Sequence, residues 1–161
     1  MSSSSNENPY LTEVLQNLPR LLALFDCDTT SASFGMGDRY HWAWGLIDFS
    51  NGTFQGAAHG IARLWKAGLW PYSSATGSFY QRIDSIFQAT AVMTRRNGSL
   101  EEAFPNEGSY CVTALVAFDL LCTLDLLASE IDEERLLKWK EVIAPLTKFL
   151  NMIPYIKYNL N

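Results

Sequence analysis

The sequence predicts an all-α protein built from antiparallel helical hairpins. Apolar residues recur at three- and four-residue intervals over most of the chain, which is the periodicity of an amphipathic helix. No stretch sustains the alternation of β-branched and polar residues that is typical of strands. The 161 residues, 48% of them hydrophobic, can form one core. We therefore expect a disordered tail over residues 1–8 and a single α-helical domain over residues 9–161.

The first helix is expected from Pro9 to Phe25, where leucine and valine repeat at helical spacing, and Pro19 is expected to kink or split it. Residues 26–51 lose any sustained period and combine glycines with a dense cluster of aromatic residues. Because this aromatic content is too high for a solvated linker, we expect the segment to be ordered and either to pack on the protein or to line a cavity.

The second helix is expected over about residues 53–68 and carries a stripe of glycines. Gly52, Gly56 and Gly60 recur at four-residue intervals and so share a face. A glycine costs roughly 1 kcal/mol relative to alanine inside a helix. Three of them in register indicate that another backbone approaches closely there.

A third helix is expected over about residues 78–96, and Asn97 and Gly98 are expected to end it. Its predicted core face consists of Phe79, Ile83, Ile86, Phe87, Thr90 and Met93. Residues 99–102 match a capping box and are expected to open a short turn, which residues 105–108 end.

The helix expected over residues 109–129 is apolar on every side, which is typical of a helix surrounded by protein or lipid. We expect an inner helix and no membrane span. Asp119 and Asp125 would each cost on the order of 3 kcal/mol near the centre of a bilayer, and no basic cluster flanks the segment. Residues 132–150 are amphipathic again and predict an outer helix.

The charge balance and the cysteines restrict the function classes and the compartment. A net charge of −5 argues against a surface that neutralises phosphates, so we expect no nucleic-acid partner. The 3 cysteines show no disulfide framework, and Cys111 and Cys122 would lie about 16 Å apart along one helix. The N-terminal Ser/Asn run does not resemble a signal peptide. We therefore expect a cytoplasmic protein.

Residues 37–49 bring charge, imidazole and aromatic rings together just before the glycine-striped helix. Aromatic faces stack on sugar rings or bases, while charged and imidazole groups orient a hydroxylated ligand. The alternative is that the aromatic rings seal the end of the helical bundle, with the charged residues pairing or capping locally. The candidate substrate-binding residues are Asp38, Arg39, Tyr40, His41, Trp42, Trp44 and, from the following helix, Gln55.

A second polar segment, residues 104–110, occupies the equivalent place before the apolar helix. If the two helices run parallel, both polar segments lie at one end of the molecule, where helix dipoles favour anionic groups. Asp48 and Glu107 would then be the carboxylates that act as acid and base across a sugar. The alternative is that Glu107 supports the start of the apolar helix by its charge, and that Asp48 or Asn51 starts the preceding helix.

His59 lies midway between Gln55 and Arg63 on one helix face, which could line a pocket. A lone histidine on a helix is more often a packing or surface residue than a ligand. No zinc-type spacing, phosphate loop or nucleophile-elbow motif is present, so we expect no metal and no cofactor. The aspartates in apolar helical surroundings, Asp84 among them, are expected to be paired, with Arg82 or Tyr80 as candidate partners.

Residues 37–60 (GDRYHWAWGLIDFSNGTFQGAAHG) and 104–117 (FPNEGSYCVTALVA), each placed before an inner helix, resemble the N-terminal part of an α/α-toroid protein. The proteins that it resembles are heparinase- and glycosidase-like and are associated with bacterial polysaccharide clusters. The likeness covers roughly residues 35–150 as a general pattern. It implies a partial toroid with a sugar cleft where loops enter the inner helices. The residues that it would place in the cleft are Trp42, Trp44, Asp48, His59, Glu107 and Tyr110.

On this likeness Asp48, Glu107, His59 and Tyr110 are the candidate catalytic residues of a glycoside hydrolase or polysaccharide lyase. The expected helices make at most half of a closed ring, so a further toroid half, a second copy or loss of catalysis is implied. The first hypothesis is a carbohydrate-related helical domain that binds or processes a glycan through the two polar-aromatic loops. The alternatives are a non-catalytic helical adaptor or oligomerisation module, and a terpenoid- or lipid-handling protein with a largely apolar cavity.

Overall fold

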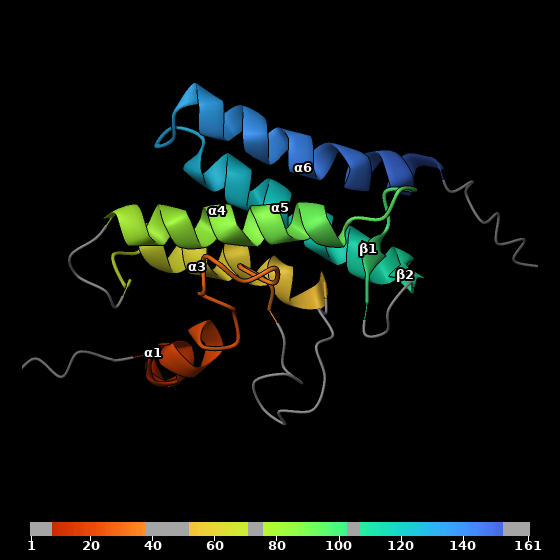
Figure 1. Cartoon of the computed structure of the whole chain (residues 1–161). Helices are drawn as coiled ribbons and strands as arrows, with labels where there is room; N and C mark the ends of the chain where they lie inside the picture. The colour runs from red at the N-terminus through yellow and green to blue at the C-terminus, as the bar shows by residue number, and fades with distance from the viewer. Residues whose placement is uncertain (1–7, 38–51, 71–75, 103–106, 153–161) are drawn as a thin grey trace, which may run out of the picture.

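A computed structural model describes residues 8–37, 52–70, 76–102 and 107–152. Helices dominate these residues, as predicted, and one two-stranded antiparallel ribbon accompanies them. The elements in chain order are α1 (Pro9–Leu22), the 3₁₀ helix η1 (Gly52–Gly56), α3 (Ala57–Lys66), α4 (Thr76–Met93), β1 (Leu100–Glu101), β2 (Gly108–Ser109), α5 (Tyr110–Leu127) and α6 (Glu133–Met152). Figure 1 shows α3 to α6 packed side by side, with α4 running back along α3 and α6 running back along α5.

The N-terminal part follows its prediction in most respects. Asn8 caps α1, because its side chain accepts a hydrogen bond from the backbone N–H of Tyr10 at 3.0 Å. Pro19 was expected to kink or split the helix, and it does not split it, because α1 continues through Pro19. Residues 23–37 form turns and a bridge between Phe25 and Gly37, which confirms the irregular segment as far as Gly37. The remainder of that segment, and all of the predicted tail except Asn8, lie outside the described residues.

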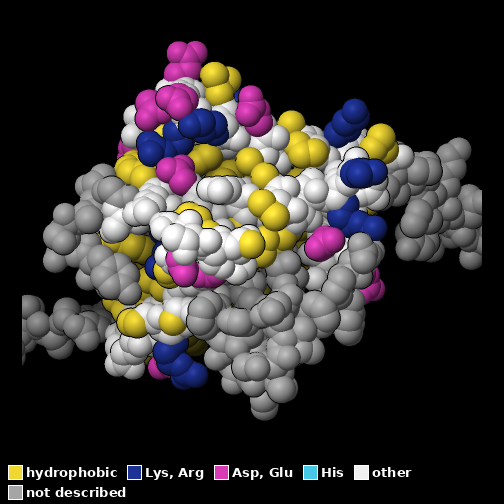
Figure 2. Space-filling view, in the orientation of Figure 1, with side chains coloured by type: hydrophobic (Ala, Val, Ile, Leu, Met, Phe, Trp, Pro, Cys, Tyr) yellow, Lys and Arg dark blue, Asp and Glu magenta, His cyan; other side chains and the backbone are white. Residues whose placement is uncertain are grey.

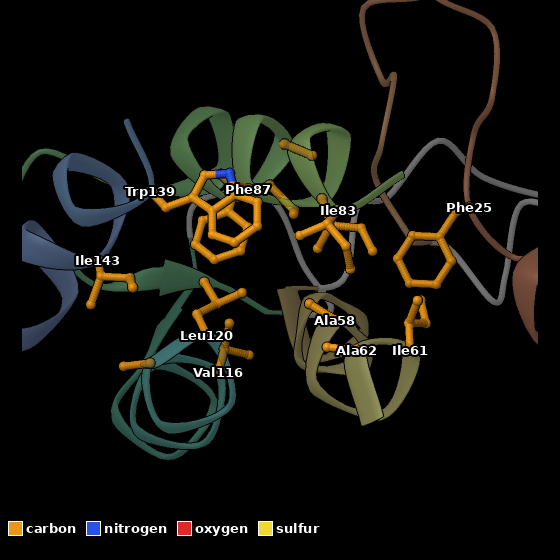
Figure 3. Packing of buried hydrophobic residues seen from close by; sticks show 14 of the residues in the cluster. Phe25, Ala58, Ile61, Ala62, Ile83, Phe87, Val116, Leu120, Trp139 and Ile143 are labelled. Carbon is orange, nitrogen blue, oxygen red and sulfur yellow. The ribbon is translucent and has the colours of Figure 1, made fainter. Parts of the chain in front are cut away.

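The core gathers around α4, and its predicted face is confirmed because all six of the expected residues are buried. The indole ring of Trp139 on α6 stacks on Phe87, with ring centroids 4.5 Å apart (Figure 3). From α5, Val116 and Leu120 reach toward the same rings (Figure 3). Trp139 was not among the residues expected in the core, although it is almost fully buried.

The capping box predicted at residues 99–102 is wrong, because Leu100 and Glu101 form a strand. Leu100 pairs with Ser109, and its backbone N–H donates to the Thr113 hydroxyl at 2.9 Å. These bonds and the full burial of Leu100 outweigh the local capping pattern. The Ser99 hydroxyl instead donates to the Asn97 side chain at 2.7 Å, in the turn that follows α4.

The helix α5 was expected to be surrounded on every side, and the described residues surround only part of it. Its neighbours η1, α3 and α6 cover one face only. Leu115, Phe118 and Leu121 stay exposed, with 55%, 63% and 43% of their surface accessible. By length and composition α5 could cross a membrane, but core helices meet the same criterion, so this does not decide between the two environments.

The glycine stripe has three different environments. A Cβ atom on Gly52 would lie 2.5 Å from the carbonyl oxygen of Glu101, so the predicted close approach of another backbone is confirmed there. At Gly56 the neighbour is a side chain, the carboxylate of Asp119. A Cβ atom on Gly60 would meet nothing within 4 Å. The prediction therefore holds for one of the three glycines.

The helices α3 and α5 run in parallel, with their starts at the same end. Gly52, which begins η1, lies against β1, and β1 pairs with β2 immediately before α5. Further along, His59 of α3 meets Asp119 of α5, and Trp65 at the end of α3 donates to Glu130, just after α5, at 3.2 Å. The parallel arrangement on which the sequence-based site depends is thus present.

Candidate functional site

The structure describes four of the sequence-predicted site residues, namely Gln55, His59, Glu107 and Tyr110. The others lie outside the described residues; they are Asp38, Arg39, Tyr40, His41, Trp42, Trp44 and Asp48. We call the end of the molecule where η1 and α5 begin the rim, and define it by Gly52, residues 100–102 and residues 107–110.

At the rim, the carboxylate of Glu107 faces solvent. Its backbone carbonyl accepts the N–H of Glu102 at 3.0 Å, which extends the β1–β2 ribbon. The carboxylate itself has no hydrogen bond or ion pair with any described residue. The side chain that caps α5 is Ser109, whose hydroxyl oxygen accepts the N–H of Val112 at 3.3 Å. Glu107 therefore presents its carboxylate to solvent.

Tyr110, at the start of α5, presents aromatic surface at the rim. The side chain is 53% exposed, and its ring centroid lies 6.4 Å from that of Phe149 on α6. The Phe149 ring supports one part of the tyrosine, while the remainder stays accessible. The rim therefore carries an exposed carboxylate and an exposed aromatic ring.

His59 and Asp119 form a pair between α3 and α5. The imidazole Nδ1 lies 3.4 Å from the Asp119 Oδ1, and the two side chains are 24% and 33% exposed. Gly56 makes the pair possible, because a Cβ atom there would lie 2.5 Å from the Asp119 Oδ2. The contact brings an imidazole and a carboxylate together between the two helices.

Aspartates in apolar helical surroundings were expected to be paired, but His59 was not predicted as the partner of Asp119. The signal was present in the spacing, because Gly56 and His59 lie on successive turns and leave room for a side chain from the neighbouring helix. Asp119 follows Tyr110 by nine residues, so about 13 Å of helix axis separates the pair from the rim. The structure brings His59 to Asp119 but not to Glu107.

Gln55 is fully buried and serves the backbone. Its side-chain oxygen accepts the N–H of Gly37 at 2.9 Å, and its amide nitrogen donates to the carbonyls of Gly35 and Ile86 at 3.1 and 3.0 Å. Each polar atom of the side chain therefore has a partner inside the protein. Gln55 holds the irregular segment against α4 and does not share an accessible face with His59.

A polar network lies at the far end of α3 and α5. Glu130 accepts hydrogen bonds from Lys66, from the Trp65 indole at 3.2 Å and from the Tyr80 hydroxyl at 3.2 Å. The bond from Lys66, followed by those from Trp65 and Tyr80, holds the pKa of the Glu130 carboxyl below its usual value. Burial, together with the nearby Glu130 charge, raises the pKa of Tyr80.

Asp84 was expected to pair with Arg82 or Tyr80, and this is wrong. Its carboxylate accepts the Nε–H of Arg135 at 3.1 Å and the indole N–H of Trp139 at 2.9 Å. Both donors come from α6, which packs on α4, so only the tertiary arrangement brings them together. The three residues line a cleft of about 490 Å³ between the two helices. Because its charges are paired within the protein, we assign the cleft a structural role.

The described residues contain no group of three or more His, Cys, Asp or Glu side chains that could hold a metal ion. Comparison with protein-family models, with curated proteins and with solved structures found no match to this chain.

Proposed function

We propose that this chain is a carbohydrate-related helical domain that binds or processes a glycan chain at the rim. The observation that carries the proposal is the common end of η1 and α5, where Gly52 packs on β1 and β1 pairs with β2. The sequence puts the aromatic segment 38–51 directly before Gly52 and the segment 103–106 directly before Glu107. Both polar segments are thus joined to the same end of the molecule.

Binding at the rim rests on Glu107 and Tyr110. A free carboxylate accepts hydrogen bonds from sugar hydroxyls. Because the carboxylate is charged, these bonds are stronger than bonds to a neutral acceptor. The exposed Tyr110 ring offers an apolar face to the C–H surface of a sugar ring. We expect Trp42 and Trp44 to add similar surfaces, on the basis of their sequence segment.

Processing requires a proton acceptor, and the pair of His59 and Asp119 supplies one. The Asp119 carboxylate lies beside Nδ1, so Nε2 is the imidazole nitrogen left to face a substrate. A glycan lying along the seam between α3 and α5 would reach from the rim to this pair over about 13 Å. Glu107 would then bind one sugar at the rim, and His59 would face another sugar further along the same glycan.

The exposed face of α5 fits the proposal of a partial α/α toroid. Leu115, Phe118 and Leu121 would pack against the inner helices of a further toroid half or of a second copy. In such an arrangement α5 becomes the inner helix that its composition predicts.

The proposal is tested by isothermal titration of the full chain with cellohexaose, xylohexaose, maltohexaose and hexagalacturonate. We expect at least one of these probes to bind, and we expect Glu107→Gln and Tyr110→Ala each to weaken that binding about tenfold or more. Neither side chain is buried, so the melting temperature should change little. Glu141→Gln on the exposed face of α6 is the matched control and should bind normally.

Two further variants separate binding from processing. His59→Asn and Asp119→Asn should retain binding and lose any release of shorter sugars, which chromatography of the probe would detect. Absence of binding by all four probes would overturn the proposal, as would equal binding by wild type and both rim variants.

The second candidate function is a non-catalytic adaptor or oligomerisation module, which the exposed apolar residues of α5 favour. In that case sedimentation would show an oligomer that Phe118→Glu dissociates, and no hexasaccharide would bind. A chain that oligomerises through α5 and also binds sugar at the rim would support the toroid arrangement.

A further inference from the structure

A groove of about 420 Å³ lies between α1 and α3 and is built almost entirely from apolar side chains. Leu11, Val14 and Leu21 form one wall, and they are 36%, 43% and 49% exposed. Phe25 and Ile61 are buried and lie beside each other at its base (Figure 3). Exposed apolar walls over a buried apolar base favour an apolar ligand.

One charged side chain borders the groove. Arg63 on α3 is the only ionisable residue among those that line it, and it is exposed. Its guanidinium has no ion pair or hydrogen bond with any of the described residues. An unpaired guanidinium at the border of an apolar groove complements a ligand that carries one negative charge on an aliphatic body.

The volume of the groove lies within the range of small-molecule sites. Figure 2 shows hydrophobic side chains on the side of the molecule where α1 lies, with basic and acidic side chains near them.

We propose that this groove binds a single aliphatic chain that ends in a carboxylate, with the chain between α1 and α3 and the carboxylate on Arg63. The site goes beyond the proposed glycan function, and none of its residues belongs to the rim or to the pair of His59 and Asp119.

Gly60 allows the groove to be filled without disturbing the fold. It lines the groove, and a Cβ atom there would meet nothing within 4 Å. A larger side chain at this position enters open space and replaces a residue that is unfavourable in a helix. Gly60→Leu therefore blocks the groove, while Gly60→Ala is the matched control that leaves most of it open.

The experiment is isothermal titration of the full chain with decanoate, below the concentration at which decanoate forms micelles. We expect saturable binding of one decanoate per chain. Gly60→Leu should weaken it at least tenfold, whereas Gly60→Ala should change it less than threefold. Thermal melting of both variants confirms that they are folded.

The role of Arg63 is tested with a probe of opposite charge, decyltrimethylammonium. Wild type should prefer decanoate, and Arg63→Gln should weaken decanoate binding about tenfold while leaving the cation unaffected or improved. The proposal is overturned by absence of saturable decanoate binding, by normal binding to folded Gly60→Leu, or by equal binding of the two probes. A wild-type dimer that Gly60→Leu dissociates would also overturn it and would assign the groove to a second copy.

Discussion

Replacing Gln55 by leucine is expected to lower the free energy of unfolding by about 2–6 kcal/mol, since each buried polar group left without a partner costs about 1–3 kcal/mol. The Gly37 N–H and the Gly35 carbonyl would lose their partners inside the protein. The Ile86 carbonyl still accepts a hydrogen bond from the Thr90 hydroxyl at 2.8 Å, so losing Gln55 costs less free energy at this carbonyl. Urea unfolding followed by tryptophan fluorescence measures the change.

Gln88→Leu is the matched control, because Gln88 lies exposed on α4. Its free energy of unfolding should stay within about 0.5 kcal/mol of wild type. If Gln55→Leu were as stable as Gln88→Leu, the buried amide would not hold residues 35–37 against α4, and this part of the fold would be wrong.

Gly35→Ala is expected to destabilise the protein by about 2–5 kcal/mol. Gly35 has a φ of +81°, and a side chain in that conformation costs roughly 1–2 kcal/mol. Its Cβ atom would also clash with the backbone carbonyl of Ser85, and relieving such a clash in a packed region costs about 1–3 kcal/mol more. Thermal melting should show the change, at about 2–4 °C for each kcal/mol in a chain of this size.

Gly68→Ala separates the two costs, because Gly68 also has a positive φ, of +69°, while a Cβ atom there would meet nothing within 4 Å. This variant should lose only the conformational part, roughly 1–2 kcal/mol. The difference between the two variants measures the close approach of Gly35 to Ser85. Equal melting temperatures would contradict the packing of the irregular segment on α4.

Periodicity predicted the fold where one face of a helix meets the core. The face of α4 was predictable because Phe79, Ile83 and Phe87 repeat at helical spacing, and burial follows from that spacing. Trp139 was missed because its neighbours on α6 are charged, and only the ring of Phe87 on another helix explains its burial. The ribbon was missed because β1 and β2 are held by contacts between distant residues and not by a local pattern.

The candidate site was predictable to a similar extent. Glu107 and Tyr110 were found because they precede an apolar helix, and the structure exposes both of them. The partner of His59 was not found, because the pairing with Asp119 depends on the register between α3 and α5. The spacing of residues could not predict the burial of Gln55 either, because its hydrogen-bond partners are Gly35, Gly37 and a carbonyl of α4.

Chemical-shift mapping tests the glycan site most directly. The ¹⁵N-labelled chain would be titrated with whichever of the four hexasaccharides binds it. The proposal predicts that the largest shifts occur at Glu107, Ser109 and Tyr110, with smaller shifts at His59. Shifts confined to α6 or to the cleft beside Asp84, with the rim signals unchanged, would contradict it.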